Sequence, residues 1–169
     1  DGVDTAAFAT GMAAINAVFM TFLEAGAHVV ISDVAYGGTY RLSQLVYTRF
    51  GVDVTFVDSS NNDAVAAAVR DDTALILTET PANPTLKLTD ISAVSAIAKE
   101  HGVPHAVDNT FLTPYFQPVF ELGADLAIHS TTKYLDGHNA TVGGAVVMAR
   151  QEHVEPVHFT RNTTGSIMS

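Results

Sequence analysis

Short runs of apolar, β-branched residues alternate with helix-like stretches along most of this chain, and this alternation limits the fold more than any other feature. The runs that we interpret as strands cover residues 29–32, 53–57, 74–78, 105–108, 125–129 and 144–149. Helical patterns cover residues 12–24, 38–50, 63–70 and 90–101. Strands alternating with helices in this way predict an α/β fold: a mostly parallel sheet with helices on both faces.

Composition restricts the classes of protein and of partner. The 169 residues are 47% hydrophobic and 15% charged, which indicates one globular domain with a sizeable core. The net charge of −10, without any cluster of lysine or arginine, argues against nucleic acid and anionic membranes as partners. The absence of cysteine excludes disulfides and thiolate metal sites. With no basic leader and no apolar run of about 18 residues, a cytoplasmic protein is expected.

Ligands of open α/β sheets bind beyond the carboxyl ends of the strands, so the segments that follow the predicted strands carry the candidate site. These segments are AYGGT, ETPANP, DNTF and HSTTK. A further candidate is ATGM, because Thr10 can cap the helix that follows, and Gly11 and Met12 then offer backbone N–H groups to an anion such as phosphate. An ordinary capped helix is the alternative for that stretch.

Each side chain in these segments has a structural as well as a chemical interpretation. Tyr36 could stack on a flat ligand or simply belong to a glycine-rich turn, and Asn83 could donate a hydrogen bond or mark a proline-stiffened loop. Asp108 ends an apolar strand, where it needs a cation as partner or caps the next turn.

The segment HSTTKYLDGH combines hydroxyl groups with an amine. Ser130 and Thr132 offer hydroxyls to an anion, while Lys133 is a nucleophile if burial tunes its amine, or a surface lysine otherwise. A metal hydrolase built on His101 and His105 is disfavoured, because Gly102 and Pro104 between them prevent one helix face from carrying both; no metal is predicted.

Pyridoxal 5'-phosphate is the cofactor that requires all of these groups together. It needs a lysine that binds its aldehyde, a carboxylate at the pyridine nitrogen, an aromatic ring over the pyridine, and a phosphate cup of hydroxyl and N–H groups. The sequence therefore predicts pyridoxal phosphate chemistry.

The motifs ATGMAAI, YGGTYRL, ETPANPTLKLTDI, VDNTF and HSTTKYLDGH, in this order and spacing, resemble the Cys/Met-metabolism, or trans-sulfuration, family of pyridoxal phosphate enzymes. The resemblance implies the large cofactor domain of fold-type-I, aspartate-aminotransferase-like enzymes. It also implies roles: Lys133 binds the cofactor as an aldimine and carries protons, Asp108 keeps the pyridine nitrogen protonated, and Tyr36 stacks and assists proton transfer. Further contacts implied for the cofactor are Gly11, Met12, Ser130 and Thr132 at the phosphate and Asn83 near the 3′-oxygen.

The family implies γ-elimination or γ-replacement on cystathionine or a homoserine ester, in the manner of cystathionine γ-synthase or γ-lyase. Methionine γ-lyase and O-acetyl- or O-succinylhomoserine sulfhydrylase remain alternatives, as does an inactive binding module of the same fold. Gly38, where methionine γ-lyases typically carry cysteine, disfavours the first, and Asn139 and Ala140 replace a Ser-Asp or Gly-Asp pair.

The resemblance also implies a small sulfur or homoserine-type amino acid as substrate and a homotetramer of two catalytic dimers. Residues 1–169 are expected to be most of the large domain of a longer polypeptide. The family's substrate-carboxylate arginine would lie in a C-terminal domain and its Tyr-x-Arg pair in an N-terminal arm, both outside this segment.

Overall fold

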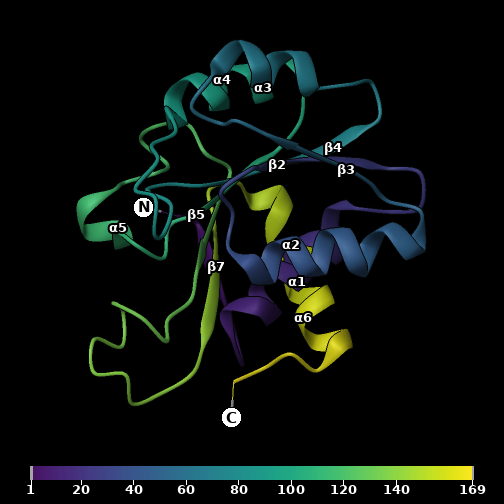
Figure 1. The fold of residues 1–169 in the computed structure, drawn as a ribbon. Coiled ribbons are helices and arrows are strands. Elements are labelled where there is room, and N and C mark those ends of the chain that lie inside the picture. Colours follow the sequence, from purple (N-terminus) through teal and green to yellow (C-terminus); the bar gives the residue numbers. More distant parts are fainter. Residues whose placement is uncertain (1, 169) are drawn as a thin grey trace.

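The computed structural model describes residues 2–168 and folds them around a single seven-stranded sheet (Figure 1). The strand order is β1-β7-β6-β5-β4-β2-β3. The strands are β1 (Asp4–Phe8), β2 (His28–Ser32), β3 (Asp53–Val57), β4 (Thr73–Glu79), β5 (His105–Asp108), β6 (Leu126–His129) and β7 (Gly144–Met148).

The central strands run parallel, as the sequence predicts. Strands β3, β2, β4, β5 and β6 pair in parallel, whereas β7 pairs antiparallel with both β6 and β1. Only β7 is reversed among the strands of the described residues, so the predicted mostly parallel sheet is confirmed. The carboxyl ends of β2, β4, β5 and β6 consequently lie along one edge, where the candidate segments begin.

Helices cover both faces of the sheet, which also confirms the prediction (Figure 1). One face carries α1 (Gly11–Phe22), α2 (Gly37–Leu45) and α6 (Val154–Thr164), and the other carries α3 (Asn62–Ala68) and α4 (Ile91–His101). Alternate residues of a strand pack against the helices on opposite faces of the sheet. Val29 and Ile31 pack toward α1, and Val30 packs toward α3 and α4. Burial of such a side chain contributes about 1.5–3 kcal/mol.

Capping residues begin the main helices where the sequence indicates. The Thr10 hydroxyl accepts a hydrogen bond from the N–H of Ala13 at 2.9 Å, and Asp90 caps α4 by accepting from Ala93. Gly102 ends α4 in the left-handed conformation, with φ of 68°, which glycine adopts without steric cost.

Several elements differ from the predicted ones. The helix expected over 38–50 is divided at Val46, with φ of −115°, into α2 and the 3₁₀ helix Tyr47–Phe50. Strand β1, the short helix α5 (Thr113–Phe116), the 3₁₀ helix Gln151–His153 and α6 were not predicted. No helix among residues 2–168 combines the length and apolar character needed to cross a membrane.

Candidate active site

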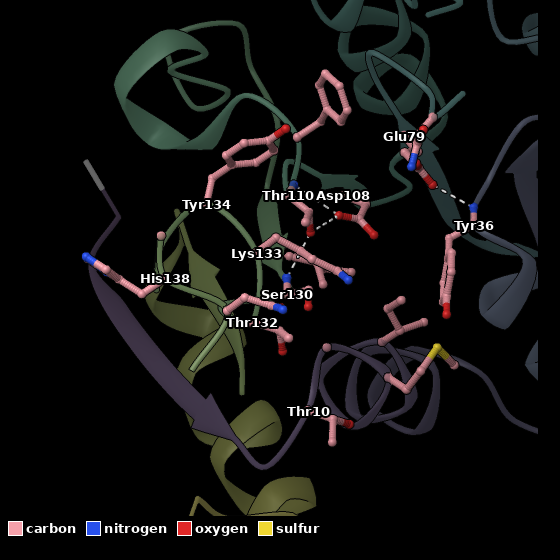
Figure 2. A pocket seen from close by; sticks show the side chains of 18 residues that line it. Thr10, Tyr36, Glu79, Asp108, Thr110, Ser130, Thr132, Lys133, Tyr134 and His138 are labelled. Carbon is pink, nitrogen blue, oxygen red and sulfur yellow. Dashed lines mark hydrogen bonds between the residues drawn. The ribbon is translucent and has the colours of Figure 1, made fainter. Parts of the chain in front are cut away.

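A pocket of about 760 Å³ opens at the carboxyl edge of the sheet, next to the first turn of α1 (Figure 2). It is lined by residues that follow β2, β4, β5 and β6. All eight predicted site residues line it: Gly11, Met12, Tyr36, Asn83, Asp108, Ser130, Thr132 and Lys133. The structure thus brings together positions separated by up to 122 residues along the chain, and their roles remain predictions.

The first turn of α1 forms a tight cradle with the end of β6. A Cβ atom added to Gly11 would lie 2.8 Å from the Cβ of Ser130, so only glycine permits this approach. A Cβ at Gly144, the first residue of β7, would collide with the backbone carbonyl of Thr10. The first residues of α1 and Ser130 therefore line the same part of the pocket, where the free N–H groups typical of a helix start suit an anion.

Asp108 ends β5 inside the pocket, and among residues 2–168 its carboxylate accepts hydrogen bonds only from the next turn. Its Oδ1 accepts from the hydroxyl of Thr110 at 2.6 Å and from the Thr110 N–H at 3.1 Å. Burial raises the pKa of this carboxyl, and the bonds from Thr110 oppose the rise. Among residues 2–168 no lysine, arginine or histidine forms an ion pair with it. The turn-capping alternative is therefore confirmed, and a cationic partner for Asp108 stays a prediction.

Thr110 is a site residue that the sequence interpretation missed. Its hydroxyl donates to Asp108 and accepts from the N–H of Ser130 at 2.8 Å, so it connects the carboxylate to the anion cradle. The segment DNTF contained this residue, but nothing in its spacing indicated a bond to a strand end 20 residues later.

Lys133 extends into the pocket from the turn after β6, toward the side where Asp108 and Tyr36 lie (Figure 2). Lys133 is exposed in the described part of the chain, which agrees with the surface-lysine alternative, and its role toward a cofactor stays a prediction. Thr132, beside it, is fixed by the backbone of Gly143: the hydroxyl donates to the carbonyl at 3.2 Å and accepts from the N–H at 3.0 Å.

Tyr36 lines the pocket as well, and its backbone is hydrogen-bonded to Glu79. The Tyr36 N–H donates to Glu79 Oε2 at 2.6 Å. Burial and the nearby Asp108 carboxylate raise the pKa of Glu79 to about 7, while bonds from the N–H groups of Tyr36 and Asn83 oppose that rise. Glu79 is the second residue that sequence reasoning missed, because ETPANP alone is typical of an ordinary turn.

Gly38 leaves room for the tyrosine ring. A Cβ at this position would collide with the ring of Tyr36 and lie 2.5 Å from the sulfur of Met12. A side chain at position 38 would therefore displace the ring from the pocket wall.

The two histidines considered for a metal site lie in different environments. His105 is fully buried and bonded to the hydroxyls of Thr78 and Ser95, whereas His101 is exposed near the end of α4. The described part of the chain holds no cluster of three potential metal ligands.

The groups present fit pyridoxal phosphate. The space beside Gly11 would admit its phosphate. The Asp108 carboxylate, which forms no ion pair among residues 2–168, would contact its pyridine nitrogen. Lys133, which lines the same pocket, would reach its aldehyde. A parallel sheet with this donor set at its carboxyl edge defines the fold-type-I class of pyridoxal-phosphate-dependent proteins.

Comparison with known proteins gives the family. The family model described as "Cys/Met metabolism PLP-dependent enzyme" matches residues 1–169, and the chain belongs to this family.

Individual relatives agree with this assignment. Cystathionine gamma-lyase of Bacillus subtilis is 52% identical over 162 residues, which cover 96% of this chain and 42% of that protein. Cystathionine gamma-synthase of Mycobacterium leprae is 44% identical over 169 residues, or 100% and 44% of the two chains. The crystal structure of cystathionine gamma-lyase from Lactobacillus plantarum, complexed with L-serine, superimposes with a TM-score of 0.97 at 41% identity, covering 99% and 44%. The chain spans less than half the length of each of these relatives.

Proposed function

We propose that the protein is a pyridoxal-phosphate-dependent trans-sulfuration enzyme that catalyses γ-elimination or γ-replacement on cystathionine or a homoserine ester. The observation that carries this proposal is the convergence, in one pocket, of a lysine, a buried carboxylate without a cationic partner, and a glycine cradle for an anion. The family and the named activities of its relatives support the same reaction class.

Bound pyridoxal phosphate supplies an electron sink for the carbon next to the substrate amino group. Around it, Gly11, Met12, Ser130 and Thr132 would hold the phosphate, and Lys133 would bind the aldehyde carbon through its amine. During turnover the freed Lys133 amine would take the proton from Cα of the substrate and return it elsewhere. Because lysine is flexible, one amine can serve both positions in turn.

Asp108 would remain an anion against the pyridine nitrogen. Burial alone raises the pKa of its carboxyl, but a cation in contact would reverse this shift, and the carboxylate would in turn keep the nitrogen protonated. Tyr36 would lie over the ring and assist proton transfer to the leaving group. Asn83 would donate to the ring oxygen.

Related activities with other substrates are alternatives to the proposed reaction. Methionine γ-lyase or homoserine sulfhydrylase activity would use the same pocket, although Gly38 provides space for the Tyr36 ring where methionine γ-lyases typically carry cysteine. An inactive binding module is a different class, and the presence of Lys133, Asp108 and Tyr36 in one pocket argues against it. Release of 2-oxobutyrate, pyruvate and thiol from a panel of cystathionine, homoserine esters and methionine distinguishes all of these.

The same proposal includes the domain and its assembly. We infer that residues 1–169 are most of the large cofactor domain of a cytoplasmic homotetramer made of two catalytic dimers, with substrate groups bound partly by other segments. The coverage of less than half of each relative supports the presence of further segments in the whole protein.

The decisive experiment is reduction of the cofactor onto its lysine. The complete protein is incubated with pyridoxal phosphate, treated with borohydride and digested, and the modified peptide should contain Lys133. The variant Lys133→Ala should lose this label. Lys99→Ala removes an exposed lysine of α4 and should keep the label on Lys133. Absence of any label in the unmodified protein would overturn the proposed function.

A further inference from the structure

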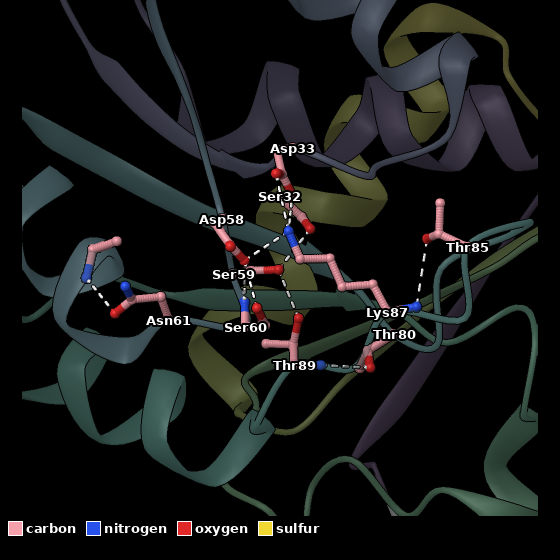
Figure 3. A network of polar contacts seen from close by, with 11 residues as sticks. Ser32, Asp33, Asp58, Ser59, Ser60, Asn61, Thr80, Thr85, Lys87 and Thr89 are labelled. Atoms are coloured by element: carbon pink, nitrogen blue, oxygen red, sulfur yellow. Dashed lines mark hydrogen bonds and ion pairs between the residues drawn. The ribbon is translucent and has the colours of Figure 1, made fainter.

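A group of polar contacts connects the segments after β2 and β3 with the loop after β4, with a lysine amine between two carboxylates (Figure 3). The Lys87 amine lies 3.0 Å from both oxygens of Asp33 and 2.6 Å from Oδ1 of Asp58. The lysine side chain is 22% exposed, whereas the side chains of Asp33 and Asp58 are 40% and 50% exposed. We call Lys87, Asp33 and Asp58 the lysine clamp.

The clamp joins two strand ends to a loop. Asp33 follows β2 directly, Asp58 follows β3, and Lys87 belongs to the loop 80–90 between β4 and α4. Lys87 contributes a charge-assisted hydrogen bond to each of the two neighbouring strand ends. Without it, loop 80–90 would be tied to these strand ends by neutral hydrogen bonds alone.

The backbone of Lys87 closes the turn that carries Asn83. The N–H of Ala82 donates to the Lys87 carbonyl at 3.0 Å, and the N–H of Leu86 donates to the Ala82 carbonyl at 2.7 Å. A displacement of Lys87 is therefore transmitted to Asn83, which lines the pocket on the same turn.

A chain of buried hydroxyls reinforces the same loop. Ser59 bonds to Ser32 and to Thr89, each at 2.7 Å, and the N–H of Thr89 donates to the Thr80 hydroxyl at 3.0 Å. These four side chains are almost fully buried, so they hold the two ends of loop 80–90 while the clamp holds its middle.

The clamp also reaches the loop of Tyr36. Asp33 lies three residues before Tyr36, whose N–H is bonded to Glu79 at the start of the other loop. Two connections, Glu79 to Tyr36 and Lys87 to Asp33, thus tie the Tyr36 loop to the segment that carries Asn83.

We propose that Lys87 is a positioning residue that sets the distance between Tyr36 and Asn83 across the cofactor pocket. This inference rests on the proposed function, since it assigns Lys87 to the binding of pyridoxal phosphate without contact with it. Loss of the clamp would let the two loops move independently and weaken the cofactor site.

Lys87→Met tests this inference, and Arg70→Met is its matched control. Both variants replace a cation paired with two carboxylates, and the partners of Arg70, Asp53 and Asp72, lie at the amino ends of the strands, away from the pocket. The first readout is hydrogen exchange of the apoprotein. Lys87→Met should speed exchange about tenfold at the amides of Ala82 and Leu86, equivalent to about 1.4 kcal/mol, and Arg70→Met should not.

The second readout is the dissociation constant of pyridoxal phosphate, followed by the circular dichroism of the bound cofactor. Lys87→Met should weaken binding about tenfold and alter the cofactor dichroism, and Lys87→Arg should restore most of both because it keeps the charge. If Lys87→Met does not fold, Asp33→Asn gives the same test, since it cuts only the connection to the Tyr36 loop.

The outcomes separate the two proposals. Unchanged exchange in loop 80–90, or unchanged cofactor binding and dichroism in Lys87→Met, would overturn the positioning role. An equal loss in Arg70→Met would overturn it as well, because the effect would then be general destabilisation. A wild-type protein that binds no pyridoxal phosphate would overturn the proposed function, while exchange in the apoprotein would still decide whether Lys87 holds the loop.

Discussion

His105 makes the stability of this protein depend on pH in a way that needs no cofactor. The ring is fully buried on β5, with Nε2 2.8 Å from the Thr78 hydroxyl and Nδ1 2.9 Å from the Ser95 hydroxyl. A neutral ring donates one of these bonds and accepts the other. Burial lowers the pKa of His105 from 6.5 to about 3, so the ring stays neutral in the folded state at any pH above that value.

The direction of this pH dependence follows from the number of protons that the folded and the unfolded chain bind. Below pH 6.5 the unfolded chain binds a proton at this ring and the folded chain does not, so the free energy of unfolding falls as the pH falls. The stabilisation is present above pH 6.5 and is lost progressively toward pH 3. Between pH 7 and pH 5, a neutral buried ring with an unfolded pKa of about 6.5 loses about 1.9 kcal/mol.

The assay is urea unfolding at pH 7, 6 and 5 for the unmodified protein and for His105→Gln. Glutamine does not titrate, so the variant should lose about 1.9 kcal/mol less between pH 7 and pH 5, whatever its absolute stability. His101→Gln, four residues away on an exposed position, should keep the pH dependence of the unmodified protein.

Equal pH dependence in the unmodified protein and in His105→Gln would refute this reasoning. Where the variant unfolds, the ring resonances of His105 give the same answer by NMR. They should not titrate between pH 7 and pH 5, and a midpoint near 6.5 would show that burial does not hold the ring neutral.

Two further predictions concern the pocket. Asp108→Asn should retain part of the cofactor but lose most activity, because an amide cannot keep the pyridine nitrogen protonated; cofactor absorbance and turnover measure this, and unmodified turnover would contradict it. Gly11→Ala should weaken pyridoxal phosphate binding about tenfold or more, since its Cβ would lie 2.8 Å from that of Ser130. Gly37→Ala, the same change at the first residue of α2 with no atom nearer than 3.6 Å, should bind the cofactor normally; equal affinities of the two variants would contradict this.

The elements that the sequence predicted are those with a local signal. Strands β3 and β5 have the predicted bounds because their apolar runs are compact and are followed by a polar residue or turn. Strand β1 was missed since only Ala6 and Phe8 of its five residues are buried, and its strand character depends on pairing with β7, about 140 residues later. Helix α6 begins with Val154, Glu155 and Pro156, and its contacts are with α1 and β1, so the sequence alone gave little indication of it.

The residues of the candidate site also fall into those that the sequence indicated and those that only the fold reveals. Side chains that meet a ligand have recognisable types, so Lys133, Asp108 and Tyr36 could be selected from the sequence. Thr110 and Glu79 act on backbone N–H groups 20 and 43 residues away, and such partners follow only from the folded path. The sequence left the exposure of Lys133 open for the same reason, since it depends on how the loop after β6 turns.

Some distances in the pocket are fixed by the sheet and others by loop contacts, so substitutions in the loops should change only the second group. Asp108 and Ser130 follow adjacent parallel strands in which Asp108 is paired with Ile128, so their separation is fixed by the ladder of the sheet and by Thr110. Tyr36 and Asn83 are on loops, and their separation depends on the side chains of Glu79 and Lys87. Perturbing the loop contacts should therefore move the ring and amide contacts while leaving the carboxylate and the anion cradle in register. A variant such as Lys87→Met would then still be labelled by borohydride on Lys133, although with weaker affinity for the cofactor.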